Sequence, residues 1–217
     1  MIATHAEYLG PSWMRVNQSG SPQLRRKLDL PTDTLPILAF DPGGTTGWSL
    51  LVLPKLWGNK SVFLWPQDMI LRNKIRWHHG QFDCIVNEDN AVYNILKMID
   101  EWPSAAIVVE DFILRSNRNE MSRELLSPVR ITAKIEHHLW KQKRKMWLQM
   151  PSQAKTVSSD ERLRAWGVYT SEGGLQHARD ADRHVMLFVR RCMGSKGIAT
   201  RNVAWPHLFE AHESNGA

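Results

Sequence analysis

The chain has 217 residues, of which 42% are apolar and 23% charged, and its formal net charge is +6. This length fits one globular domain with a single core, and no apolar run is long enough to cross a bilayer. The positive charge favours a polyanionic partner without identifying one, and two cysteines are too few for a disulfide framework.

Both cysteines, Cys84 and Cys192, are interpreted as reduced and structural. The N-terminus lacks a secretory pattern, so we expect a cytoplasmic protein, in the host cytoplasm if a bacteriophage encodes it. The ten tryptophans are expected to anchor the core or an interface.

Residues 1–34 show no sustained periodicity and carry the basic trio Arg25-Arg26-Lys27. This composition predicts a loosely ordered N-terminal extension. Periodic apolar patterns begin at residue 35 and end near residue 193. We therefore expect one domain over residues 35–193 and an irregular C-terminal tail over residues 194–217.

Apolar runs within the domain predict strands, and helical spacing or capping residues predict helices. The predicted strands cover residues 35–40, 47–53, 61–65, 74–82, 105–109 and 145–150, and the predicted helices cover residues 90–102, 128–143, 158–166 and 177–192. A hairpin followed by alternating β and α elements predicts an α/β fold, with a mixed sheet flanked by helices.

The most informative segment joins the first two predicted strands. An apolar strand ends at Asp41, and the turn Pro42-Gly43-Gly44 follows directly. Glycines allow a ligand to approach the backbone closely, and a carboxylate on rigid β-structure can hold a divalent cation. A second acid, Glu110, ends the predicted strand at 105–109 in the same way.

The third acidic position lies on the last predicted helix. At 3.6 residues per turn, His177, Asp180 and His184 share one helix face. Asp182 points in nearly the opposite direction, beside Arg179, Arg183 and Arg190. We therefore expect Asp180 to take part in the chemistry and Asp182 to lie on a solvated, salt-bridged face.

Hard oxygen ligands suit Mg²⁺, with Mn²⁺ as a substitute, and two such ions can cleave a phosphodiester bond by in-line displacement. On this hypothesis Asp41 bridges both ions, Glu110 serves one, and His177 and Asp180 serve the other. The crowded carboxylates should repel one another until cations bind. The sequence thus predicts a metal-dependent nuclease.

The same residues resemble the motifs of RuvC-type Holliday-junction resolvases, in particular their bacteriophage-encoded relatives. Four segments carry the resemblance, in the family's order: Asp41-Pro42-Gly43 with Thr46-Gly47-Trp48, Val109-Glu110, residues 151–157 with Lys155, and His177-Ala178-Arg179-Asp180-Ala181. The resemblance implies an RNase H-like fold, a homodimer, and Mg²⁺-dependent cleavage of branched DNA such as four-way junctions. It also implies that Lys155 lies near the active site.

The residues that follow the second acid are candidates for DNA contact. The resemblance makes Phe112 the nearest counterpart of an aromatic residue that probes the junction. Arg115 and Arg118 follow the second acid closely along the chain, so we expect them to bind phosphates. Asp111, directly after Glu110, departs from the pattern of the family. It could be a secondary ligand or a solvated acid.

Three alternatives stay open. The turn after Asp41 could be the phosphate loop of a sugar kinase or actin-like ATPase, although such chains need a second glycine-rich loop. The chain could be a catalytically silent DNA-binding scaffold. Within the nuclease class, a flap- or fork-cutting enzyme or a DNA-packaging nuclease is also compatible with the motifs.

Overall fold

The structure is a computed structural model that describes residues 34–54, 76–113, 125–166, 168–169, 175–193 and 195–209. The strand predicted at 61–65 lies outside these ranges. Five strands form one sheet in the order β3-β2-β1-β4-β5. Their bounds are β1 Thr34–Asp41, β2 Thr45–Pro54, β3 Arg76–Asp83, β4 Ala106–Glu110 and β5 Met146–Gln149.

The sheet is mixed, as the sequence predicts. β1, β2 and β3 pair antiparallel, whereas β4 is parallel to β1 and β5 is parallel to β4. The register pairs Phe40 with Val109, so the next residues, Asp41 and Glu110, end neighbouring parallel strands at one edge of the sheet. Ligand sites in α/β proteins gather at such carboxyl ends.

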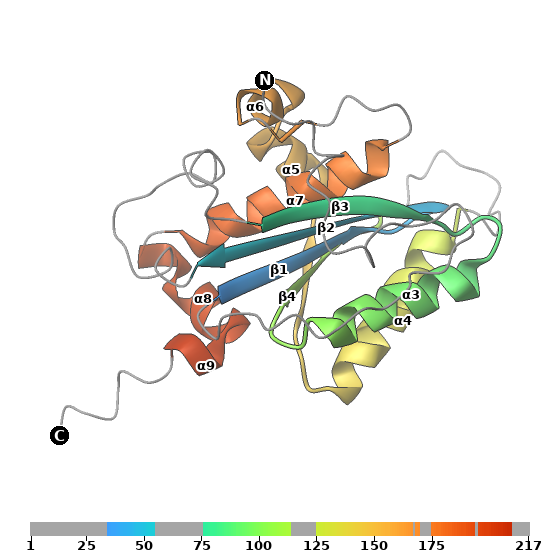
Figure 1. The fold of residues 1–217 in the computed structure, drawn as a ribbon, viewed down its shortest axis with the longest axis horizontal. Helices are drawn as coiled ribbons and strands as arrows, with labels where there is room; N and C mark the ends of the chain where they lie inside the picture. Colours follow the sequence, from blue (N-terminus) through green and yellow to red (C-terminus); the bar gives the residue numbers. More distant parts are fainter. Residues whose placement is uncertain are drawn as a thin grey trace.

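Helices cover both faces of the sheet (Figure 1). Helices α3 (Glu88–Glu101) and α4 (Ser127–Lys141) lie on one face, and α7 (Gln176–Cys192) crosses the other. The short helices α5 (Pro151–Val157) and α6 (Asp160–Ala165) lie beyond α7. In the part of the chain that is described, no helix is long and apolar enough to span a membrane.

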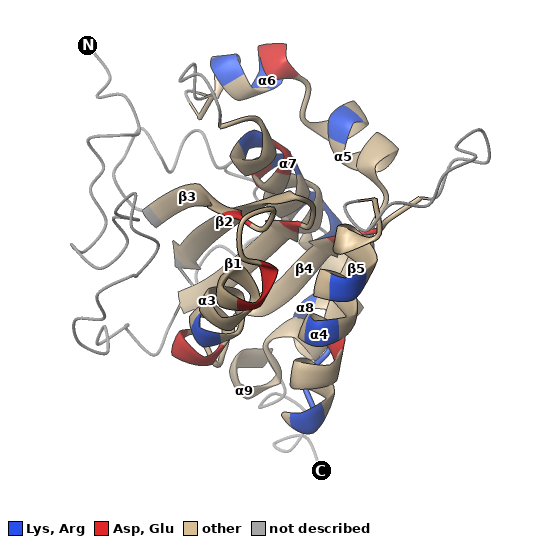
Figure 2. Cartoon of the chain, turned by 90° about the vertical axis from the view of Figure 1, so that its right-hand side faces the viewer, with Lys and Arg blue, Asp and Glu red and all other residues tan. Residues whose placement is uncertain are grey.

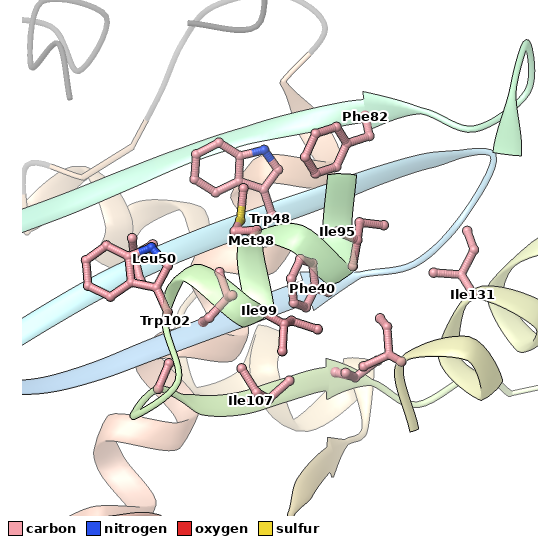
Figure 3. Packing of buried hydrophobic residues seen from close by; sticks show 14 of the residues in the cluster. Phe40, Trp48, Leu50, Phe82, Ile95, Met98, Ile99, Trp102, Ile107 and Ile131 are labelled. Carbon is pink, nitrogen blue, oxygen red and sulfur yellow. The ribbon is translucent and has the colours of Figure 1, made fainter. Parts of the chain in front are cut away.

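The alternation of side chains along the strands separates two apolar clusters, one on each face of the sheet. Figure 3 shows the first cluster, in which Trp48, Phe82 and Met98 pack beneath β2 and β3. The second cluster joins β1 to α7 through residues such as Phe188. Both faces of the sheet are therefore buried.

The expectation of an irregular C-terminus is wrong for residues 195–209. These residues form a 3₁₀ turn, η2 (Ser195–Gly197), and two short helices, α8 (Ile198–Ala204) and α9 (Pro206–Phe209). Trp205, between α8 and α9, is fully buried and makes an edge-on contact with Phe188 of α7. Its indole Nε1 donates a hydrogen bond to the Pro36 carbonyl at 3.3 Å.

A basic residue in the turn after α4, Arg144, packs against the end of α3 and the loop that follows it. Arg144 is partly buried and donates hydrogen bonds to the carbonyls of Ile99, Trp102 and Ala105. It thereby satisfies backbone acceptors between α3 and β4.

Trp140 is 72% exposed, so it is not a core residue. Cys84 and Cys192 are buried and unpaired, as expected.

Candidate metal and nuclease site

Asp41 sits at the start of the tight hairpin between β1 and β2. Its side chain is buried at the carboxyl end of β1. The Thr46 hydroxyl lies 3.2 Å from both the backbone nitrogen and the carbonyl oxygen of Gly43, which closes the turn locally. The Asp-Pro-Gly-Gly-Thr-Thr segment thus holds one carboxylate on a rigid support.

Gly47 explains how α7 reaches Asp41. Gly47 is paired with Asp41 across the hairpin, and the backbone of α7 packs directly on it. A Cβ at Gly47 would lie 2.0 Å from the His177 carbonyl oxygen, which leaves no room for a side chain. This close approach places the His177 ring beside Asp41, with Nδ1 and Oδ2 2.8 Å apart.

Three other candidate residues influence the ionisation of Asp41. Burial raises the pKa of Asp41, the nearby carboxylates Glu110 and Asp180 raise it further, and the hydrogen bond with His177 opposes them. The hydrogen bond that His177 makes to the Asp41 carboxylate is also the main cause that raises the pKa of His177. Glu110 and Asp180, from β4 and α7, therefore both act electrostatically on the Asp41–His177 pair.

Glu110 is held by His184, a residue to which the sequence gives a helix face but no role. His184 is fully buried on α7, and its Nε2 lies 2.6 Å from Oε2 of Glu110. Its Nδ1 lies 3.0 Å from Oε1 of Gln149 on β5. The helical spacing of His177, Asp180 and His184 was the sequence signal for this contact.

Asp180 pairs with Arg183 one turn later on α7. The Arg183 guanidinium also pairs with Asp160 and donates from Nε to the Ser158 carbonyl at 3.1 Å. Arg183 is therefore buried between α7 and the α5–α6 segment, and the expectation that it lines a solvated face is wrong.

The solvated position expected for Asp182 is also wrong. Asp182 is fully buried, and its Oδ1 accepts hydrogen bonds from the Ser49 hydroxyl at 2.7 Å and from the Trp77 indole at 2.9 Å. Its Oδ2 lies 2.8 Å from His79 Nδ1. Because α7 crosses the sheet, the helix face opposite Asp180 packs on β2 and β3 rather than facing water.

The remaining predicted site residues that the structure describes are more exposed to solvent than Asp41. Lys155 is exposed on α5, and Asp111 and Phe112 are partly exposed just after β4. Asp111 donates its backbone N–H to the Gln149 carbonyl at 2.8 Å, which extends the sheet by one bond. Arg115 and Arg118 lie outside the described residues.

The donor set has the right chemistry for a hard divalent cation, because it combines a buried carboxylate with two more carboxylates and an imidazole. Within the described ranges, however, no three His, Cys, Asp or Glu side chains converge as a cation site. Asp41, Glu110 and Asp180 are each engaged by a histidine or an arginine instead. Figure 2 looks onto this end of the sheet and shows basic residues on α4, α5 and α6 around it.

Comparison with known proteins supports the architecture. No family model and no curated protein matches the sequence. Two solved structures of RuvC from Thermus thermophilus, one of them in complex with a Holliday junction substrate, have a TM-score of 0.51 to this chain. They are 10% and 12% identical, and each match covers 73% of this chain and 95% of the RuvC chain. At this identity the similarity establishes the fold alone: the chain has a RuvC-like α/β fold.

Proposed function

We propose that this protein is a metal-dependent endonuclease that hydrolyses phosphodiester bonds of branched DNA, with four-way junctions as its substrate. One observation carries the proposal: Asp41 and Glu110 end neighbouring parallel strands, His177 of α7 lies against Asp41, and Glu110 and Asp180 both act electrostatically on Asp41. The RuvC-like fold supports it, since one matching RuvC structure holds a Holliday junction substrate.

The metal ligands proposed here are Asp41, Glu110, His177 and Asp180, and the ion is Mg²⁺ or Mn²⁺. A bound pair of such ions would activate water for in-line attack and stabilise the leaving oxygen. The chain's own contribution is to hold the ligands in place. Asp41 is fixed by the hairpin and His177 by its hydrogen bond to Asp41, while Arg183 holds Asp180.

Residues around the ligands would bind the DNA. Lys155 is exposed on α5, whose apolar side packs on α7, and its proposed role is to meet a phosphate and stabilise developing charge. Phe112, Arg115 and Arg118 follow Glu110 along the chain and are proposed DNA contacts. A homodimer would present two such sites to the two strands of a junction. Membership of the bacteriophage-encoded branch rests on the sequence motifs alone.

Cleavage of synthetic DNA tests this function. The full chain is incubated with a four-way junction, a flap and a linear duplex, in Mg²⁺, Mn²⁺ or EDTA. We expect cutting of the junction with either cation and none in EDTA. Asp41→Asn should abolish cutting, because it removes a charged ligand. Asp89→Asn is the matched control, since Asp89 is 91% exposed on α3, and it should cut like the wild type.

Other outcomes point to other functions. Junction binding without cleavage in any divalent cation would favour a silent scaffold. Equal cutting of the flap and the junction would favour a broader nuclease, and ATP hydrolysis without DNA would favour the kinase-like alternative. Full activity of Asp41→Asn would contradict the proposed site.

A further inference from the structure

We propose that His184 is a positioning residue that holds Glu110 in place for the metal, and that Gln149 in turn fixes the His184 ring. This inference rests on the proposed function, because it concerns a proposed metal ligand. It assigns a role to two residues that the sequence motifs leave without one.

The three side chains form a continuous chain of contacts across β4, β5 and α7. His184 is fully buried, with Nε2 at 2.6 Å from Glu110 Oε2 and Nδ1 at 3.0 Å from Gln149 Oε1. Glu110 and Gln149 are register partners in the parallel β4–β5 pair. The contacts therefore join rigid elements rather than loops.

The identity of its partner, Glu110, decides which ring nitrogen of His184 carries the hydrogen. A metal-binding Glu110 is ionised, and a carboxylate only accepts hydrogen bonds, so Nε2 of His184 must donate. The imidazole is then neutral if Nδ1 accepts a hydrogen bond. Gln149 can supply that donor from its amide group.

Gln149 carries a second observation that favours this arrangement. Its side chain is buried, and among the described residues its Nε2 has no hydrogen-bond partner, which is costly inside a protein. A half-turn of the terminal amide exchanges the oxygen and the nitrogen and directs Nε2 at Nδ1 of His184. Gln149 would then donate to Nδ1, and His184 would donate from Nε2 to Glu110.

This chain of contacts matters because Glu110 is only partly buried. Its side chain is 22% exposed, and no other side-chain hydrogen bond to it is seen among the described residues. Without His184 the Glu110 carboxylate would sample several rotamers, and ordering it again would weaken metal binding. Such supporting groups typically change metal affinity by about 10- to 100-fold.

Mn²⁺ binding to the full chain without DNA, measured by calorimetry, provides the first test. His184→Phe fills the space but removes both contacts, and we expect about 10- to 100-fold weaker binding. His184→Gln places an amide nitrogen near the Nε2 position and should recover most of the affinity. His184→Asn reaches only toward Gln149 and should not recover it. His138→Phe is the control, because His138 pairs with Asp100 at the far end of α4.

Rescue by Gln but not by Asn is the outcome that a merely structural role would not give, and thermal unfolding shows that each variant is folded. Unchanged Mn²⁺ affinity in His184→Phe, or equal affinities in the Gln and Asn variants, would overturn the proposal.

Nitrogen NMR of His184 in the metal-free wild type gives an independent test. The proposal requires the proton on Nε2 and a change in that signal in Glu110→Gln. A bare Nε2 would overturn the proposal even in an active nuclease. A wild type that binds no Mn²⁺ and cuts no DNA would instead overturn the proposed function, whatever the NMR result.

Discussion

Asp182 is a buried carboxylate in contact with three hydrogen-bonding side chains, and we expect it to support the fold rather than the proposed reaction. Ser49 and Trp77 on β2 and β3 donate to one oxygen, and His79 lies against the other. A buried carboxylate that loses acceptor capacity leaves donors unsatisfied, at a cost of about 1–3 kcal/mol. Asp182 therefore anchors α7 on the sheet, at the side away from Asp180.

We predict that Asp182→Asn lowers the free energy of unfolding by about 2 kcal/mol, because the amide NH₂ group would face a donor. Urea unfolding measures this loss. Cleavage per folded molecule should stay close to that of the wild type. Asp100→Asn is the control, since the side chain of Asp100 is 50% exposed, and it should change stability far less. Equal loss of cutting in Asp182→Asn and Asp41→Asn would place Asp182 in the active site.

Glu88 at the start of α3 gives a pH dependence of known sign. Hydrogen bonds from Arg130, then from Ser127, lower the pKa of Glu88 from 4.5 to about 2. A depressed carboxyl pKa contributes stability that is complete above the unfolded value and is lost as pH falls through the folded value. The Glu88 contribution should therefore be present above pH 4.5 and disappear as the pH falls towards about 2.

Glu88→Gln should accordingly cost roughly 1 kcal/mol at pH 7, and the difference from the wild type should shrink at pH 3. Urea unfolding at both pH values provides the measurement. Asp89→Asn serves as control, because the Asp89 side chain is 91% exposed and its substitution should change the free energy of unfolding little at either pH. If the stability difference between Glu88→Gln and the wild type is the same at pH 7 and pH 3, the ion pair with Arg130 is not the cause of that difference.

At the scale of elements, the docking of α7 on β2 depends on the absence of a side chain at Gly47. The helix backbone at His177 and Ala178 occupies the space that a Cβ would need. Backbone cannot give way as a flexible side chain can, so the helix itself must move. His177 would then lose its contact with Asp41.

We predict that Gly47→Ala lowers the free energy of unfolding by about 3 kcal/mol and abolishes cleavage in the folded fraction. Gly44→Ala in the same hairpin is the matched control for stability. Among the described residues its Cβ would meet only the exposed side chain of Ile85, which can turn aside. Equal destabilisation by the two substitutions, in thermal or urea unfolding, would refute the close approach of α7.

The elements that could be predicted from the sequence are those whose own residues specify them. Apolar runs ending in Asp41 and Glu110 predict β1 and β4, and apolar spacing predicts α3, α4 and α7 close to their observed bounds. The short helices α5, α8 and α9 have too few turns for a period to show. They depend on tertiary packing, as the buried Trp205 beside Phe188 illustrates.

The candidate site could be predicted in part for the same reason. Helical spacing puts His177, Asp180 and His184 on one face, but it cannot state what covers the opposite face. Asp182 and Arg183 were therefore misplaced, because α7 is covered by the sheet on one side and by the α5–α6 segment on the other. Partners such as Gln149 come from strands whose register only the folded chain defines.

At the scale of the whole molecule, the proposed site should lower the stability of the fold when no cation is bound. Burial raises the pKa of Asp41, and the carboxylates of Glu110 and Asp180 add to the effect. An acid whose pKa is raised in the folded state is costly to ionise, so its charge destabilises the fold at neutral pH. A bound cation would remove that cost and bind only the folded chain.

We therefore predict that Asp41→Asn reverses its effect on stability with metal. In EDTA at pH 7 the variant should be more stable than the wild type by about 1 kcal/mol, because it carries no buried charge. This advantage should shrink as pH falls toward 3.8, where Asp41 of the unfolded wild type also takes up its proton. With Mn²⁺ at a hundred times its dissociation constant, the wild type should gain about 2.7 kcal/mol and become the more stable protein.

Calorimetric unfolding in EDTA and in Mn²⁺ measures the reversal, and the Asp89→Asn control should follow the wild type. A variant that is less stable than the wild type in EDTA and in Mn²⁺ by the same amount would mean that Asp41 supports the fold through its hydrogen bond to His177 and holds no ion.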